Sequence, residues 1–109
     1  MVDQVSDSDL VLSARAGDKD AFSGLIERYR PLAIRVALRM VTSQDTAREL
    51  VQEATLQAYL SLKHLNRGDR FGSWLCGIVL NLCRSHIRAG RRSASSLDAS
   101  GGGERFESV

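Results

Sequence analysis

The sequence lacks long apolar runs, and this shortage argues against an integral membrane protein. No run approaches the roughly 18 apolar residues that a helix needs to span a bilayer. The amino terminus, MVDQVSDSDL, is acidic where a secretory signal would be basic and then apolar. We therefore expect a cytoplasmic protein without a transmembrane segment.

Cysteines are also few, and the two that are present, Cys76 and Cys83, do not suggest a disulfide. They lie on one predicted helix, about 10 Å apart along its axis, which is too far for an internal bridge. Cys76, Cys83 and His86 could together offer zinc ligands. However, no fourth ligand is evident and no closely spaced cysteine pair exists. We predict reduced, mostly buried structural thiols and no metal site.

Motifs for catalysis are absent. His64 and His86 have no catalytic companions in the sequence, and neither a nucleophile motif nor a glycine-rich phosphate loop is present. We therefore expect a protein that is not an enzyme and that needs no cofactor.

Proline and β-strand patterning are scarce too, and what remains is helical. The chain has one proline and no sustained alternation of apolar and polar residues. Its 109 residues, 43% of them apolar, suffice for one domain with a modest core. We predict an all-α fold, a small bundle of about four helices at about 8–16, 19–41, 44–62 and 70–89, with a disordered carboxyl-terminal tail.

Capping residues set the predicted helix boundaries. Asp7 or Ser8 should cap the first helix, Asp18 the second, and Thr42 or Ser43 the third, because their side-chain oxygens can accept bonds from free backbone amides.

The segment KHLNRGDR, residues 63–70, reads as a loop, with Gly68 as the breaker and Asp69 as the cap of the last helix. We assign residues 1–92 to the helical domain. Residues 93–109 are rich in serine and glycine and are predicted to form a flexible linker or tail. A linker that is followed by no second domain suggests a chain cut from a longer protein.

The third predicted helix has two contrasting faces. Its apolar stripe is the face expected in the core, and it consists of Ala47, Leu50, Val51, Ala54 and Ala58. The opposite side mixes acidic, amide and large apolar side chains: Glu49, Gln52, Glu53, Leu56 and Leu60. These five fall within roughly a third of the helix circumference, which is unusual for a solvated face.

The fourth predicted helix has three faces. A core stripe comprises Phe71, Trp74, Leu75, Ile78, Val79 and Leu82, so that Trp74 is expected to pack in the core and not to stack on bases. A second stripe gathers Gly77, Asn81, Arg84, Arg88 and Arg92. The third, with Cys76, Leu80, Cys83 and Ile87, is expected to be covered by a neighbouring helix.

The second stripe has two interpretations. Residues 63–92 hold seven lysines and arginines against Asp69 alone, which favours a polyanionic partner. Guanidinium groups bind phosphates, and the Asn81 amide can exchange a donor and an acceptor with a base edge. Alternatively, these arginines only favour the helix dipole and stay solvated. The pattern alone leaves both interpretations open.

Three segments together resemble, in order and spacing, the first folded domain (region 2) of bacterial sigma factors of the extracytoplasmic function (ECF) group, in the sigma-70 family. They are AGDKDAFSGLIERYRPLAIRVALRMV, DTARELVQEATLQAYLSL and RFGSWLCGIVLNLCRSHIR, and they lie within about residues 8–92. The most specific parts are ELVQEAT, close to the family's D-L-V-Q-E pattern, and the F-x-x-W-L…N block.

This resemblance implies a transcription initiation factor with two main partners. In that family the D-L-V-Q-E helix docks on the clamp helices of the RNA polymerase β′ subunit, which implicates Glu49, Gln52, Glu53, Leu56 and Leu60. The family also recognises and helps to open the promoter minus-ten element as single-stranded DNA, through the loop before the last helix and that helix itself. The matching residues are Lys63, His64, Leu65, Asn66, Arg67, Asn81, Arg84 and Arg88. An anti-sigma factor is a further partner that the resemblance allows.

The sequence departs from the family pattern in places. Thr55 stands where many members have an aromatic residue, the loop is about one residue shorter than in many, and the second domain, which reads the minus-thirty-five element, is absent. We therefore expect an excised domain or a truncated member. The alternative function is a helical protein-interaction module without sequence-specific DNA binding, whose basic stripe only aids solubility. Strong salt dependence of DNA binding would distinguish the two.

Overall fold

The computed structural model describes residues 5–99, with the backbone alone for residues 92–99. It contains four α-helices, α1 (Asp7–Arg15), α2 (Lys19–Leu38), α3 (Gln44–Ser61) and α4 (Phe71–Ala99), and two short 3₁₀ turns, η1 (Leu62–His64) and η2 (Gly68–Arg70). No strand occurs in this part of the chain. The predicted all-α fold is confirmed.

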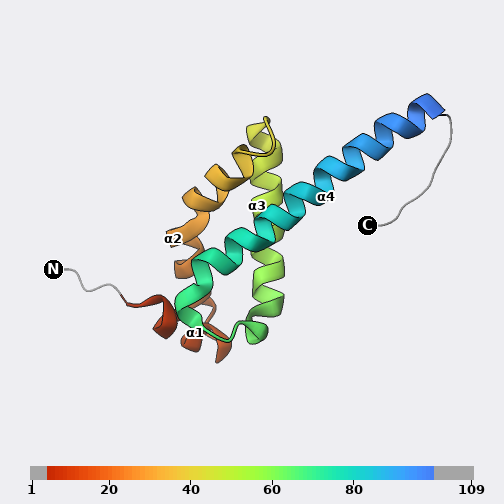
Figure 1. Cartoon of the computed structure of the whole chain (residues 1–109). Coiled ribbons are helices and arrows are strands. Elements are labelled where there is room, and N and C mark those ends of the chain that lie inside the picture. Colours follow the sequence, from red (N-terminus) through yellow and green to blue (C-terminus); the bar gives the residue numbers. More distant parts are fainter. Residues whose placement is uncertain (1–4, 100–109) are drawn as a thin grey trace.

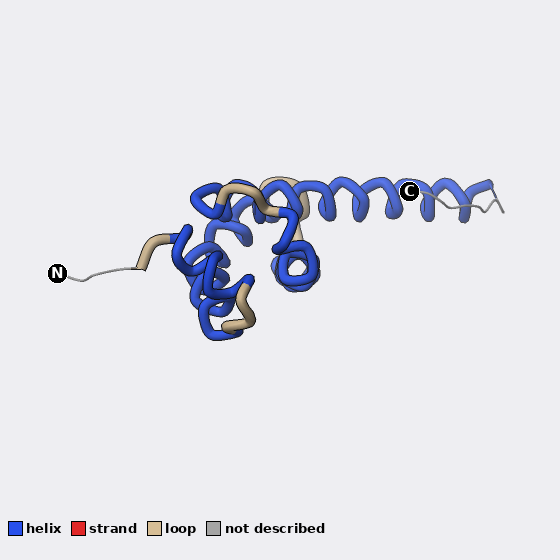
Figure 2. Tube along the Cα trace, turned by 90° about the horizontal axis from the view of Figure 1, so that it is seen from below, coloured by secondary structure: helices blue, strands red, loops and turns tan. Residues whose placement is uncertain are grey.

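The helices form a small bundle with one long projecting arm. α2 contacts α1, α3 and α4, and α4 packs across both α2 and α3. Figure 1 and Figure 2 show the carboxyl-terminal part of α4 running out beyond the other helices. Within the described part of the chain, no helix has the length and hydropathy needed to cross a membrane.

The core lies where the helical periodicity predicted it. All five residues of the predicted apolar stripe on α3 are buried, and they face Leu25, Ala33 and Ala37 of α2 within one apolar cluster. On α4 the buried line is Phe71, Leu75, Val79 and Cys83, with Trp74, Ile78 and Leu82 partly buried beside it. The predicted core stripe of α4 is thus confirmed and gains Cys83.

The predicted caps of α2 and α3 are confirmed, and the predicted cap of α1 is wrong. Asp18 accepts hydrogen bonds from the amides of Asp20 and Ala21, and Ser43 accepts one from Thr46. α1, however, is capped by Ser6, which accepts from the Asp9 amide at 3.1 Å, and not by Asp7 or Ser8. Asp7 does not cap α1 because its carboxylate is used in a tertiary contact with α2.

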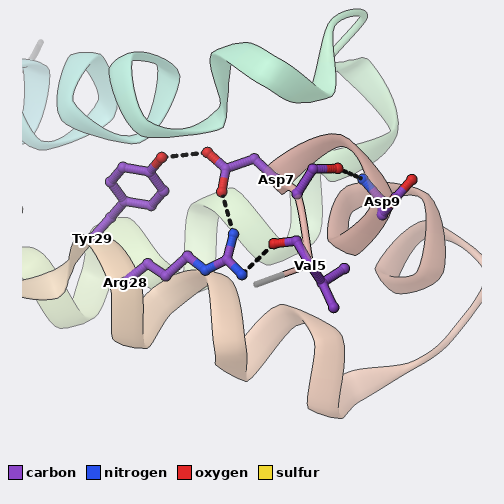
Figure 3. Close-up of polar contacts among 6 residues, drawn as sticks. Val5, Asp7, Asp9, Arg28 and Tyr29 are labelled. Atoms are coloured by element: carbon purple, nitrogen blue, oxygen red, sulfur yellow. Dashed lines mark hydrogen bonds and ion pairs between the residues drawn. The ribbon is translucent and has the colours of Figure 1, made fainter. Parts of the chain in front are cut away.

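That tertiary contact fixes α1 to the bundle (Figure 3). The Arg28 guanidinium donates to the Asp7 carboxylate at 2.7 Å and also to the Val5 carbonyl, while the Tyr29 hydroxyl donates to the other Asp7 oxygen. The Tyr29 ring lies against the backbone of α4, since a Cβ placed on Gly72 would lie 2.5 Å from the ring's Cε1. Tyr29 therefore links α1, α2 and α4.

The predicted end of the last helix is wrong. We expected it near residue 89, whereas α4 continues to Ala99; the domain boundary at residue 92 stays a prediction. Arginine, alanine and leucine are good helix formers, and extending an existing helix fixes only one residue for each hydrogen bond gained. The serine-rich composition that suggested a linker therefore does not prevent a helix over 93–99. Residues 100–109 of the predicted tail lie outside the described residues.

Candidate functional site

The mixed face of α3 points away from the core, as its sequence pattern predicted. Leu56 is 57% exposed and Leu60 is 67% exposed, and Glu49, Gln52 and Glu53 are exposed beside them. Among the described residues, neither of these glutamates takes part in an ion pair. Two solvated leucines beside unpaired carboxylates provide apolar contact area with a charged rim, which is the usual composition of a protein-docking surface.

A shallow hollow between α2 and α3 was not predicted from the sequence. It has a volume of about 230 Å³ and is lined by Phe22, Ser23, Ile26, Glu27, Arg30 and Thr55. The Thr55 hydroxyl donates to the carbonyl of Val51 in its own helix at 2.9 Å, so this side chain folds back and does not fill the space. The sequence signal for the hollow was Thr55 itself, a small residue where many family members carry an aromatic.

The connection from α3 to α4, residues 62–70, is exposed to solvent except at two leucines and the partly buried Gly68. Lys63, His64, Asn66 and Arg67 are exposed, whereas the side chains of Leu62 and Leu65 are buried in the core. The candidate DNA contacts in this loop therefore divide into two kinds. The Leu65 side chain anchors the loop in this structure and offers no surface to a ligand, and the other four are accessible.

One exposed loop residue already has a partner. Arg67 donates to Asp69 through Nη2 at 2.7 Å and through Nε at 3.2 Å, in a bidentate pair. The hydrogen bond from Arg67 lowers the pKa of the Asp69 carboxyl, and the same pair raises the pKa of Arg67. Asp69 lies inside η2 and bonds Arg67, so the prediction that it caps α4 is wrong.

The backbone of the same loop is held from α1. Arg15 donates from Nη1 to the carbonyl of Leu65 at 3.1 Å and from Nη2 to the carbonyl of Lys63 at 3.2 Å. Nothing in the local sequence indicated this contact, because an arginine in the last turn of a short helix is an ordinary pattern. The contact depends on residues about fifty positions away, which only the fold brings together.

The polar stripe of α4 is accessible, as predicted. Asn81, Arg84 and Arg88 are exposed, and Gly77 is half-buried at the inner end of the stripe. Arg84 donates to the Asn81 side-chain oxygen at 3.3 Å, and Arg88 donates to the Ser85 hydroxyl at 3.4 Å. The side chain of Arg92 lies outside the described residues. α4 begins directly after the loop, so the exposed loop residues and the α4 stripe are presented by consecutive segments of the chain.

The cysteines and Trp74 belong to the packing and not to this surface. Both thiols are free, Cys83 is fully buried and Cys76 is half-buried. Burial raises the pKa of both thiols. The Trp74 ring packs against Phe71, with ring centroids 5.9 Å apart. The prediction of a buried Cys83 is confirmed, whereas Cys76 and Trp74 are partly buried against the core.

Comparison with known proteins gives a consistent result. The family model of sigma-70 region 2 matches residues 25–93. The RNA polymerase sigma-H factor of Pseudomonas aeruginosa is 32% identical over 98% of this chain. The ECF RNA polymerase sigma-E factor of Escherichia coli K12 is 35% identical over 99% of it. The chain spans 56% of the length of each of these two relatives.

A solved structure matches in fold as well. It is the NMR structure of an engineered region 2 of sigmaE in complex with GTAAAA, which is 34% identical to this chain with a TM-score of 0.76. The match covers 84% of this chain and 97% of that one. The chain therefore belongs to the sigma-70 region 2 family, as a region 2 domain of the extracytoplasmic function group.

Proposed function

We propose that this domain docks on core RNA polymerase and recognises and helps to open the promoter minus-ten element during transcription initiation. The observation that carries the proposal is the exposure of polar and basic side chains on both the loop and α4, in a domain whose solved relative is bound to GTAAAA. The proposed partner implies a cytoplasmic location, and an anti-sigma factor is a further candidate partner. In this role the domain works by binding and needs no catalytic site.

The polymerase contact belongs to the exposed face of α3. Leu56 and Leu60 would provide the apolar anchors for the β′ clamp helices, with Glu49, Gln52 and Glu53 as the surrounding polar contacts. When a partner covers an exposed leucine, each Å² of apolar surface removed from water contributes about 25 cal/mol to binding. Their carboxylate neighbours would fix the register and exclude acidic partners.

The DNA contact belongs to the loop and α4. Lys63, His64, Asn66 and Arg67 would surround an unstacked base, and the Leu65 side chain would support the loop from within the core. Arg84 and Arg88 would neutralise phosphates, while Asn81 would read a base edge.

One set of observations favours the alternative, a helical protein-interaction module without sequence-specific DNA binding. Arg67 pairs with Asp69, and Arg84 bonds Asn81, so part of the basic surface is satisfied within the protein. These pairs are exposed, and exposed pairs contribute little free energy, so phosphates can displace them.

Fluorescence anisotropy decides between the two functions. The probes are labelled single-stranded GTAAAA and a scrambled hexamer of the same composition, titrated at several salt concentrations. We expect the wild-type chain to bind GTAAAA more tightly, with affinity that falls steeply as salt rises. Equal, salt-insensitive binding of both strands, or none, would favour the interaction module.

A further inference from the structure

The loop between α3 and α4 is clamped by a single cation from α1. The Arg15 guanidinium reaches the carbonyl oxygens of Lys63 and Leu65, at 3.2 Å and 3.1 Å, through its two terminal nitrogens. These two carbonyls stand on either side of His64. Because a planar guanidinium presents its donors in a fixed fork, holding both carbonyls at once defines the backbone path between them.

The other end of the loop also rests on α1. A Cβ placed on Gly68 would lie 3.0 Å from the Cα of Ser8 and 3.1 Å from the Cβ of Val11, which is tighter than ordinary packing. The backbone of η2 therefore lies directly on the first turns of α1, while η1 is bonded to its last residue. Helix α1 contacts both η1 and η2 and therefore supports the loop at both of its ends.

Helix α1, which supports the loop, is itself fixed to α2. Asp7, at the start of α1, is bound by Arg28 and Tyr29 of α2, and Arg28 also binds the Val5 carbonyl (Figure 3). A loop held at both ends on a fixed helix is ordered before any ligand arrives. Binding then loses less conformational entropy, which is the general advantage of preorganisation.

From this arrangement we propose that Arg15 is a positioning residue for strand recognition, which sets the loop conformation that presents His64 and Asn66 without itself contacting DNA. The proposal rests on the proposed function, because it assigns Arg15 a part in that same surface. It distinguishes Arg15 from the arginines of α4, which are not bonded to the loop backbone in the described part of the chain.

The first experiment measures loop order in the free full chain by amide hydrogen exchange. The Leu65 amide closes η1 by donating to the Leu62 carbonyl at 3.1 Å, so it reports on the loop. We expect Arg15→Ala to accelerate exchange of this amide about tenfold, because two bonds from a charged donor are lost. Exchange of the Leu50 amide in the α3 core should accelerate only as far as the loss of global stability, measured by thermal melting, requires.

The second experiment measures strand discrimination by anisotropy, with single-stranded GTAAAA and its scrambled hexamer as probes. Arg15→Ala should reduce the ratio of the two affinities about three- to tenfold and leave the salt slope unchanged, because no phosphate contact is lost. Arg15→Lys should give an intermediate ratio, since an ammonium cannot hold both carbonyls in one fixed geometry. Arg35→Ala removes an exposed arginine of α2 that does not contact the loop, and it should change neither the affinity ratio nor the salt slope.

Each outcome decides the proposal. Equal weakening of both strands by Arg15→Ala, with a shallower salt slope, would identify Arg15 as a phosphate contact and overturn the positioning role. Unchanged Leu65 exchange would overturn it as well. If the wild-type chain does not discriminate between the strands, the proposed function fails and the recognition role of Arg15 fails with it. The exchange measurement then still shows whether Arg15 orders the loop.

Discussion

At the scale of single residues, the α4 stripe is internally bonded in a way that distinguishes its members. Arg84 donates to the side-chain oxygen of Asn81, and among the described residues Arg88 bonds Ser85 alone. Arg88 is therefore the cleaner test of a phosphate contact, since its removal leaves Asn81 and its partner intact. Asn81 keeps its amide nitrogen without a hydrogen-bond acceptor among the described side chains, and so it can donate to a base.

Substitutions of Asn81 and Arg88 should have different effects on strand binding. Asn81→Ala should cost about 1–3 kcal/mol in binding to single-stranded GTAAAA and little in binding to a scrambled strand, because a base-edge contact is lost. Arg88→Ala should weaken both strands alike and reduce the slope of log affinity against log salt by about 0.7, the value for one phosphate on a single strand. Anisotropy across a salt series measures both quantities. A uniform loss for Asn81→Ala would refute its base-reading role.

At the scale of helices and loops, local periodicity made some features predictable and tertiary contacts made others unpredictable. The buried stripe of α3 and the exposure of Leu56 and Leu60 were predictable, because the 3.6-residue repeat alone decides which side chains share a face. The burial of Leu65 was not, because it depends on how the loop packs on the core. The clamp from Arg15 was equally inaccessible, since its partners are distant in sequence.

The exposed face of α3 gives a prediction on polymerase binding. Leu56→Asp should weaken binding to a β′ clamp-helix fragment by at least about 2 kcal/mol, as expected at an interface anchor, and shift stability by less than about 0.5 kcal/mol. Calorimetric titration and thermal melting measure the two effects. The matched control is Leu12→Asp, because Leu12 of α1 is 69% exposed and lies outside this face. Equal effects of both variants would show that the α3 face has no special role.

The attachment of α1 to α2 gives a prediction on stability and pH. The hydrogen bond to Asp7 raises the pKa of Tyr29 above its ordinary value of 10.0, with burial acting in the same direction. A raised pKa in the folded state means that this contact stabilises the fold fully below about pH 10 and is lost as the pH rises through the folded-state value.

Tyr29→Phe should therefore lower the free energy of unfolding by about 1 kcal/mol at pH 7. The difference from wild type should shrink as the pH is raised above 10, as measured by urea denaturation. Tyr59→Phe is the control, because the Tyr59 hydroxyl has no protein partner among the described residues. A difference that does not change with pH would mean that the Tyr29 hydroxyl does not supply the stability.

At the scale of the whole molecule, the bundle presents two surfaces on different helices. The α3 face offers apolar anchors, and the loop with α4 offers polar and basic groups, while the shared core of α2, α3 and α4 fixes one relative to the other. A rigid connection of this kind would hold a DNA strand at a defined place on the polymerase and so raise its effective concentration there. The two binding sites should therefore fail independently when each is mutated.

The most direct test asks whether each of two substitutions removes one binding activity and leaves the other intact. The Leu56→Asp and Asn81→Ala chains are each titrated against the β′ clamp-helix fragment and against single-stranded GTAAAA, alongside wild type. We predict that Leu56→Asp loses clamp-helix affinity and keeps wild-type affinity for the strand, and that Asn81→Ala does the reverse. Loss of both activities in either variant, or a wild-type chain that binds neither probe, would contradict the account.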